Sequence, residues 1–158
     1  MAFGNTSKAF AYAVLVIGEQ KIKIAGTTPN TFKFALFGNT VVPANTVTTK
    51  ALSSYTGTTS TWSTAHEVSG TGYTAGGKTI SSPTWTQTTT HLVWTSATNL
   101  SWTASSFTAY GGLVYDSTTG TTTLDQGLCY LSFGGAQTVT SGTFTVAWSA
   151  TGILRFNC

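Results

Sequence analysis

The sequence has very few charged residues. Among its 158 residues, seven are lysine or arginine and four are aspartate or glutamate, so the net charge is only +3. The densest basic group, Lys21, Lys23 and Lys33, lacks the arginines and interleaved aromatic residues of a nucleic-acid groove. Direct binding to nucleic acid is therefore not expected. So little charge also means little repulsion between molecules, which suits a protein that packs against neighbours.

Cysteine and long apolar runs are also scarce. Cys129 and Cys158 are too few for a disulfide framework; they can pair with each other, pair across subunits or remain free thiols, the state we expect. The apolar run at residues 9–17 is too short to span a bilayer. It also lacks a small-residue cleavage site, so it does not resemble a signal peptide, and no membrane partner is expected.

Strand-forming residues dominate what remains. About one residue in five is threonine, and 13% are aromatic, whereas glutamate, glutamine, lysine, methionine and arginine are rare. Hydrophobic residues make up 41% of the chain, enough for one core at this length. The composition predicts a single folded β-domain.

We expect residues 1–30 to form an N-terminal segment or arm, followed by one β-sandwich domain at residues 31–158. Residues 8–24 are the best candidate for a short helix, but their β-branched-rich centre is equally typical of a strand, so the type stays open. Residues 41–64, rich in threonine and serine and without clear periodicity, predict one long surface loop that is the main moving part.

Apolar residues alternate with polar ones in several short segments. The clearest is 143–148, where Phe144, Val146 and Trp148 share one face. Turn-forming sequences at 116–120 and 134–137 separate neighbouring segments. The pattern predicts an all-β fold, an antiparallel sandwich of the jelly-roll or Greek-key kind. The first predicted strand contains Phe32, Phe34 and Leu36, which alternate with other residues. The later predicted strands are residues 78–80, 83–87, 91–95, 99–102, 107–115, 128–133, 143–148 and 153–156.

A glycine-rich stretch interrupts this pattern. Gly70, Gly72, Gly76 and Gly77 surround Tyr73, which predicts a tight structural corner where backbones approach closely. The stretch has neither the Gly-Lys-Ser/Thr ending of a P-loop nor a following helix.

Residue types used in catalysis are present but scattered. His66 and Glu67 are adjacent, so on a strand they point to opposite faces, and no second histidine lies at ligand spacing. His91, Asp116 and Asp125 fall in separate segments, and a surface turn accounts for Asp116. We expect no catalytic residue, no metal, no cofactor and no enzymatic activity.

The five tryptophans are expected to pack in the core, with one exception; the alternative is a stacking platform for sugars. Trp62 lies in the polar stretch, where no apolar stripe accounts for it. We predict that Trp62 anchors a partner protein, together with Tyr55 and His66 nearby in the chain.

Five motifs follow one another in a distinctive order: residues 30–37 (NTFKFALF), 67–77 (EVSGTGYTAGG), 109–116 (AYGGLVYD), 142–148 (GTFTVAW) and the Gly152-Ile153 pair. This order of motifs resembles a family of small tailed-phage virion proteins that are encoded near capsid genes. The resemblance covers about residues 30–156. This chain differs by having threonine where the family more often has charged residues.

The resemblance implies a particle component and brings no catalytic residues. We expect a capsid decoration or cement protein, located in the virion and forming a homo-oligomer, that binds the major capsid protein or other virion proteins. The alternatives are a neck, tail or baseplate component, and a virion surface adhesin that binds host glycans through Trp62.

Overall fold

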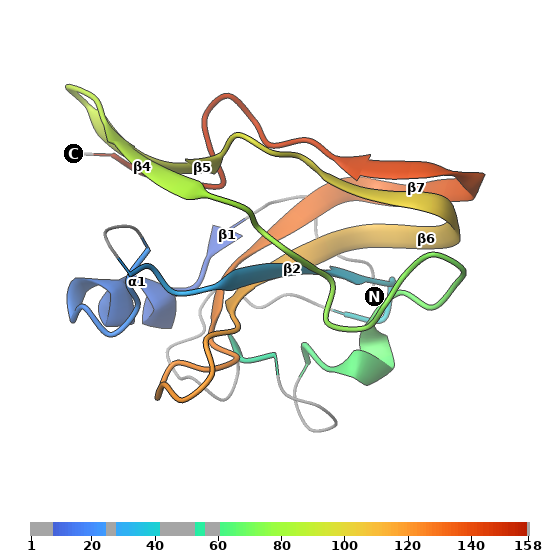
Figure 1. The fold of residues 1–158 in the computed structure, drawn as a ribbon, viewed down its shortest axis with the longest axis horizontal. Helices are drawn as coiled ribbons and strands as arrows, with labels where there is room; N and C mark the ends of the chain where they lie inside the picture. Colours follow the sequence, from blue (N-terminus) through green and yellow to red (C-terminus); the bar gives the residue numbers. More distant parts are fainter. Residues whose placement is uncertain (1–7, 25–27, 42–52, 56–60, 158) are drawn as a thin grey trace.

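The computed structural model describes residues 8–24, 28–41, 53–55 and 61–157 (Figure 1). They form two antiparallel sheets and one short α-helix, which confirms the predicted all-β, sandwich-like class. One sheet has the strand order β1-β7-β6-β2-β3 and the other β4-β5-β8. In chain order the elements are β1 (Lys8–Ala9), α1 (Ala11–Gly18), β2 (Phe32–Phe37), the 3₁₀ turn η1 (Thr64–His66), β3 (Lys78–Thr79), β4 (Pro83–Gln87), β5 (His91–Ser96), β6 (Leu100–Asp116), β7 (Gly127–Val146) and β8 (Leu154–Asn157).

The long hairpin of β6 and β7 is the centre of the fold. Figure 1 shows both strands running to one end of the molecule and turning back over themselves. Two shifts of register mark the bend, between Trp102 and Phe107 of β6, and the backbone takes a positive φ of 50° at both Ala104 and Ser141. Bulges of this kind increase the local bend of a paired ribbon. The folded ribbon thus forms two layers that face each other.

Aromatic side chains fill the space between the layers. Phe144 lies on one side of the bend and contacts Phe107 and Phe133 on the other side, with ring centroids 5.0 and 6.0 Å apart. The smaller sheet packs on β2 through Trp94, whose ring meets that of Phe32 edge-on at 5.0 Å. Such edge-to-face contacts add to the free energy of burial.

The alternation predicted for residues 143–148 is present. Val146 is buried and Phe144 and Trp148 are half-buried, whereas the intervening residues are exposed. Trp148 lies just beyond β7, where its ring packs edge-on against Phe34, with centroids 5.6 Å apart. The residues of this stripe therefore face the core.

Two boundaries differ from the sequence prediction. Segments 99–102 and 107–115 are one strand, and the turn predicted at 134–137 lies inside β7. The pairs Ala109–Gln137 and Gly111–Ser132 leave residues 133–136 opposite Tyr110 alone, so the glycines form a bulge and not a strand end. Gly134 permits this through a φ of +75°.

The N-terminal segment contains both a strand and a helix. Phe10, Ala13, Val16, Ile22 and Ile24 are buried in the same core as the sandwich. Ala13 and Val16 lie on one face of α1, while Val14 and Leu15 on the other side are exposed. Residues 8–24 therefore pack as part of the domain. Most of the loop predicted at 41–64 lies outside the described residues.

The glycine-rich stretch lies against the bend of the ribbon. Thr71 forms an isolated bridge with Ser106, and its carbonyl accepts a hydrogen bond from the Ser106 N–H. Gly77 has a φ of +67°, and a Cβ there would lie 1.9 Å from the Phe34 carbonyl oxygen. The close approach of the stretch to β2 and β6 thus requires the absence of a side chain.

Gly77→Ala should lower the free energy of unfolding by about 3 kcal/mol or more, because it combines a backbone clash with a left-handed conformation. Gly120→Ala is the matched control: φ is +77° there, but no atom lies within 4 Å of the added Cβ. It should cost only about 1–2 kcal/mol. Urea denaturation measures both, and equal losses would contradict the close packing at Gly77.

Candidate functional site

Trp62 does not stand free in a polar loop. Its side chain is 1% exposed and is surrounded by the rings of Phe10, Phe37 and Tyr130, with centroids 5.0 to 6.0 Å away. The prediction that Trp62 is an accessible anchor is wrong, because rings from the N-terminal segment, β2 and β7 provide the apolar surroundings that its sequence neighbours lack. A glycan platform built on Trp62 is contradicted by the same burial.

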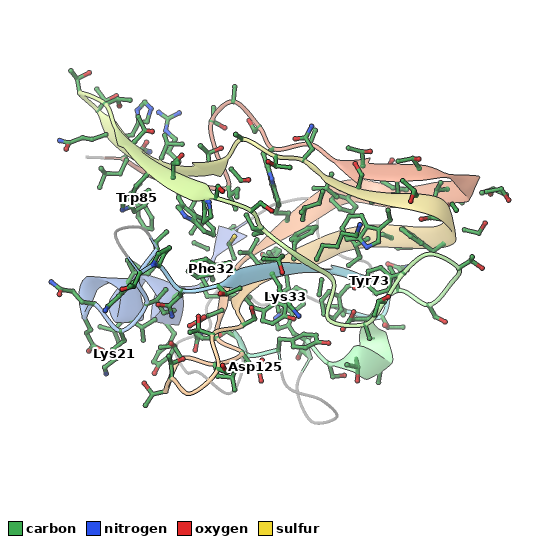
Figure 2. All side chains as sticks on the ribbon, viewed as in Figure 1. Lys21, Phe32, Lys33, Tyr73, Trp85 and Asp125 are labelled. Atoms are coloured by element: carbon green, nitrogen blue, oxygen red, sulfur yellow. The ribbon has the colours of Figure 1, made fainter. Side chains whose placement is uncertain are left out.

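Tyr55 belongs to a hydrogen-bonded cluster around the carboxylate of Glu67, which is 9% exposed. The hydroxyls of Tyr55 and Tyr73 donate to this carboxylate, the second at 2.5 Å, and the N–H of Gly76 donates to both oxygens at 3.0 and 3.1 Å. Tyr73 also reaches β2 (Figure 2), where its hydroxyl accepts a 2.9 Å bond from the Leu36 N–H. Neutral donors thus stabilise a nearly buried charge.

Tyr115 completes this cluster from β6. Its ring stacks on that of Tyr55 at 4.4 Å between centroids, and its hydroxyl donates to the Gly76 carbonyl at 2.8 Å. Burial raises the pKa of Tyr55, Tyr73 and Tyr115 above the usual value, and the charge of Glu67 raises each pKa further. These hydroxyls remain protonated hydrogen-bond donors at neutral pH, a state suited to holding strands together.

His66 lies next to the cluster but does not join it. It ends η1, and its Nδ1 lies 3.1 Å from the Ser63 hydroxyl. Among the described residues, no group of three or more histidine, cysteine, aspartate or glutamate side chains is placed to hold a metal ion. The role of Tyr55 and His66 in partner binding stays a prediction.

Asp116 is buried, which corrects its assignment to a surface turn. Its carboxylate accepts bonds from Asn30 Nδ2 at 2.7 Å, Thr123 Oγ1 at 2.6 Å and the Thr118 N–H at 2.9 Å. The three donors come from both sides of the turn and from the segment before β2. Asp116 therefore fixes the loop between β6 and β7 to the rest of the domain.

Cys129 is a free thiol in β7 and is 1% exposed. Burial raises the pKa of this thiol to about 12, so it is protonated and unreactive in the folded chain. Cys158 lies outside the described residues.

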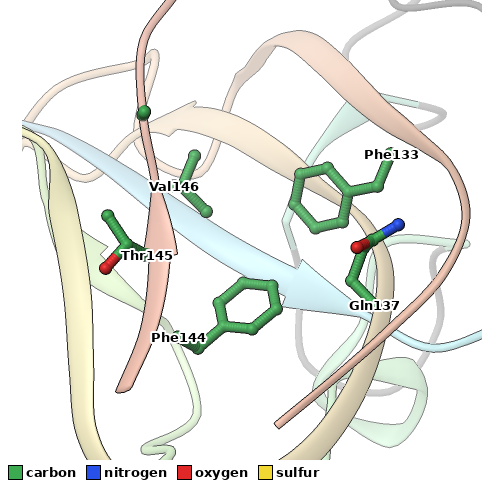
Figure 3. Close-up of a pocket in the computed structure, with 6 residues that line it drawn as sticks. Phe133, Gln137, Phe144, Thr145 and Val146 are labelled. Atoms are coloured by element: carbon green, nitrogen blue, oxygen red, sulfur yellow. The ribbon is translucent and has the colours of Figure 1, made fainter.

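An open pocket of about 380 Å³ lies between the two halves of β7 (Figure 3). Phe133 and Gln137 line it from one half, and Phe144, Thr145 and Val146 from the other, joined by Ala147. Both phenylalanine rings are only half-buried. The pocket opens at the side of the sandwich, and Gln137 and Thr145 add polar groups to the two phenylalanine rings of its wall.

A smaller pocket of about 180 Å³ lies where β1, β7 and β8 meet. Lys8 and Arg155, both exposed, provide its polar wall, and Leu131 and Leu154 are among its apolar residues. We call the side of the sandwich that contains the two pockets the β7 flank, defined by Lys8, Leu131, Phe133, Phe144 and Arg155.

Sequence reasoning missed the β7 flank. Lys8 and Arg155 are separated by nearly the whole chain, and only the pairing of β1 with β7 and the position of β8 bring them to one pocket. The one available signal was the run of residues 127–153, which contains no charged side chain. Strands near the edge of a sheet often carry charged side chains, so a strand that long without charge is unusual there.

No family model, curated protein or solved structure matches the chain. In the described part of the chain, no helix has both the length and the apolar character needed to cross a membrane.

Glu67→Gln should lower the free energy of unfolding by about 1–3 kcal/mol, because an amide has one acceptor oxygen for donors that now share two. Glu19→Gln is the matched control, since Glu19 forms an exposed ion pair with Lys21. It should change stability by less than about 1 kcal/mol. Equal thermal or urea stability of both variants would contradict a structural role for the Glu67 cluster.

Alkaline pH should unfold the protein as tyrosines ionise. The folded chain holds the pKa of Tyr55, Tyr73 and Tyr115 above the unfolded value near 10, so their contribution to stability is complete below pH 10 and is lost as the pH rises further. Absorbance at 295 nm, followed together with circular dichroism, should show three tyrosines ionising only as the fold is lost. Their ionisation near pH 10 in an intact fold would contradict this prediction.

Proposed function

We propose that the chain is a structural protein of a tailed-phage particle, and that it serves as a capsid decoration or cement protein. Two lines of argument support the proposal. The first is the ordered set of motifs between residues 30 and 156 that resembles small phage virion proteins. The second, which carries it in physical terms, is the uncharged and hydroxyl-rich outer surface of β7.

The outer surface of β7 suits a protein that is covered by neighbours. No residue of β7 is charged, and eight of its residues are exposed: Gly134, Ala136, Gln137, Thr138, Thr140, Ser141, Thr143 and Thr145. Hydroxyls pair across the hairpin, with Oγ atoms 2.8 Å apart for Thr108 and Thr138 and 3.0 Å apart for Ser101 and Thr145. When a surface of this kind is buried in an interface, no charged group loses its water without gaining a partner.

Interface burial is the proposed mechanism. A standard protein interface covers about 800 Å² on each partner, and many modest contacts on a repeating lattice act together through avidity. A rigid β-domain loses little conformational entropy when it docks. The decoration role needs nothing more than such a surface, presented in many copies to the major capsid protein.

Immunogold labelling of intact particles of the phage that encodes the chain tests this proposal. We expect dense label over the head, and quantitative mass spectrometry of purified particles should find a copy number comparable to that of the capsid lattice. Particles made without the gene are the control. Label confined to the neck or tail would overturn the decoration role in favour of a neck, tail or baseplate component. Absence of the protein from disrupted particles would overturn the particle role altogether.

A further inference from the structure

The outward face of α1 is apolar. Ala11, Val14, Leu15 and Gly18 are the exposed residues of this helix, and their spacing of three and four positions places them on one stripe. Val14 is 43% and Leu15 53% exposed, and they are the two exposed large hydrophobic side chains of the described chain. A surface helix ordinarily has polar residues on this face. The stripe therefore suits burial against another molecule.

The opposite face of α1 holds the helix on the domain. Ala13 and Val16 are buried in the core, and the helix contacts β7. Figure 1 shows α1 at one end of the molecule. With 3.6 residues per turn, Val14 and Leu15 point away from the side that carries Ala13 and Val16. The core contact thus presents the stripe in a fixed orientation.

The stripe is self-complementary in the size of its side chains. From Ala11 to Gly18 its residues are small, large, large and small. When two such helices pack antiparallel about a two-fold axis between Val14 and Leu15, the large side chains meet at the centre. Each Ala11 then lies opposite Gly18 of the partner subunit. This is the self-matching pattern that a two-fold interface requires.

The charges at the two ends of α1 favour the same arrangement. The helix, which is described in full, has no acidic residue in its first turn, no basic residue in its last turn and no side-chain cap on Phe10. Exposed Lys8 precedes its N-terminus, and exposed Glu19, paired with Lys21, follows its C-terminus. Each charge is at the end of the helix dipole that suits it less. An antiparallel copy brings the Glu19 end beside the Lys8 end of its partner.

We propose that two copies of the chain pair through α1, as an antiparallel helix contact centred on Val14 and Leu15. The helix is about 12 Å long, so the contact covers only part of the roughly 800 Å² that a standard interface buries on each partner. The pairing is therefore weak in solution and becomes effective where many copies are held close together. The inference rests on the proposed function only for that crowded setting, and the pairing itself does not depend on it.

Sedimentation equilibrium of the full chain, from micromolar to millimolar concentration, tests the pairing. We expect a reversible monomer–dimer equilibrium. Leu15→Asp should raise the dissociation constant by about tenfold or more, because it places a carboxylate at the centre of the contact. Its melting temperature should stay unchanged, since residue 15 is exposed in the monomer. Thr86→Asp, at an exposed position of β4, is the matched control and should leave the dimer intact.

Cysteine cross-linking tests the direction of the two helices. In a Cys158→Ser background, Leu15→Cys should form a covalent dimer on oxidation, because both copies of residue 15 lie beside the two-fold axis. Ala11→Cys and Gly18→Cys should cross-link poorly alone and well when mixed; a Cβ at residue 18 meets no atom within 4 Å. Thr86→Cys should give no dimer. Cross-linking of Ala11→Cys with itself would indicate parallel helices and overturn the proposed pairing.

A charge exchange tests the contact between the helix ends. Lys8→Glu should weaken the dimer several-fold, and Lys8→Glu with Glu19→Lys should restore it, with both effects smaller at high salt. Lys33→Glu, on β2, changes the net charge by the same amount and should have no effect. Equal weakening by Lys8→Glu and Lys33→Glu would contradict the approach of Lys8 to Glu19 of the partner subunit.

Three further results would overturn the inference. A chain that stays monomeric and gives no cross-link with Leu15→Cys does not pair through α1. A lower melting temperature of Leu15→Asp would show that the chain's own residues cover the stripe. Binding of the unmodified chain, but not of Leu15→Asp, to vesicles of phosphatidylserine and phosphatidylcholine, without a dimer, would assign the stripe to a lipid surface. None of these measurements uses phage particles, so failure of the virion proposal and failure of the α1 pairing are distinguishable.

Discussion

The fold depends on the bend that turns the β6–β7 hairpin back on itself. A straight hairpin of this length would present one face of aromatic residues to water, and a two-stranded ribbon has little stability alone. The bend brings Phe144 against Phe107 and Phe133, so the ribbon buries its apolar face against its own continuation. The glycine-rich stretch contacts this bend through Ser106 and stabilises it. The small sheet and β2 pack against the folded hairpin.

The carboxylates of Glu67 and Asp116 lie away from water, and both are stabilised in the same way. Glu67 and Asp116 each accept bonds from hydroxyls and from a backbone N–H, and Asp116 also from an amide side chain. Neither has a cation among the partners seen in the described chain. Each carboxylate therefore orders a loop around fixed neutral donors. A chain with seven cations has few to spare, and this arrangement leaves Lys8 and Arg155 available at the surface.

Local features of the sequence predicted the local features of the structure. The strand at 83–87 is found with the same bounds because proline and threonine-rich turn sequences mark its ends, and the stripe of Phe144 and Val146 follows directly from period two. The merging of two segments into β6 was missed, because a bend at Ala104 has no glycine or proline to mark it. Trp62 and the β7 flank were misjudged or missed for one reason: their surroundings come from distant parts of the chain, which no local pattern reveals.

The order in which strands pair has a consequence for how the chain reaches its native state. Phe32 of β2 pairs with Asp116, Lys8 with Tyr130 and His91 with Asn157. These earlier strands therefore cannot form these pairs until strands much later in the sequence have been synthesised. During synthesis the apolar β2 emerges long before β6, and its surface stays uncovered for several seconds at ordinary translation rates of about 5–20 residues per second. Pairings so far apart in sequence also make folding slow. Until β6 has been made, the nascent chain therefore exposes an apolar strand that can associate with other chains.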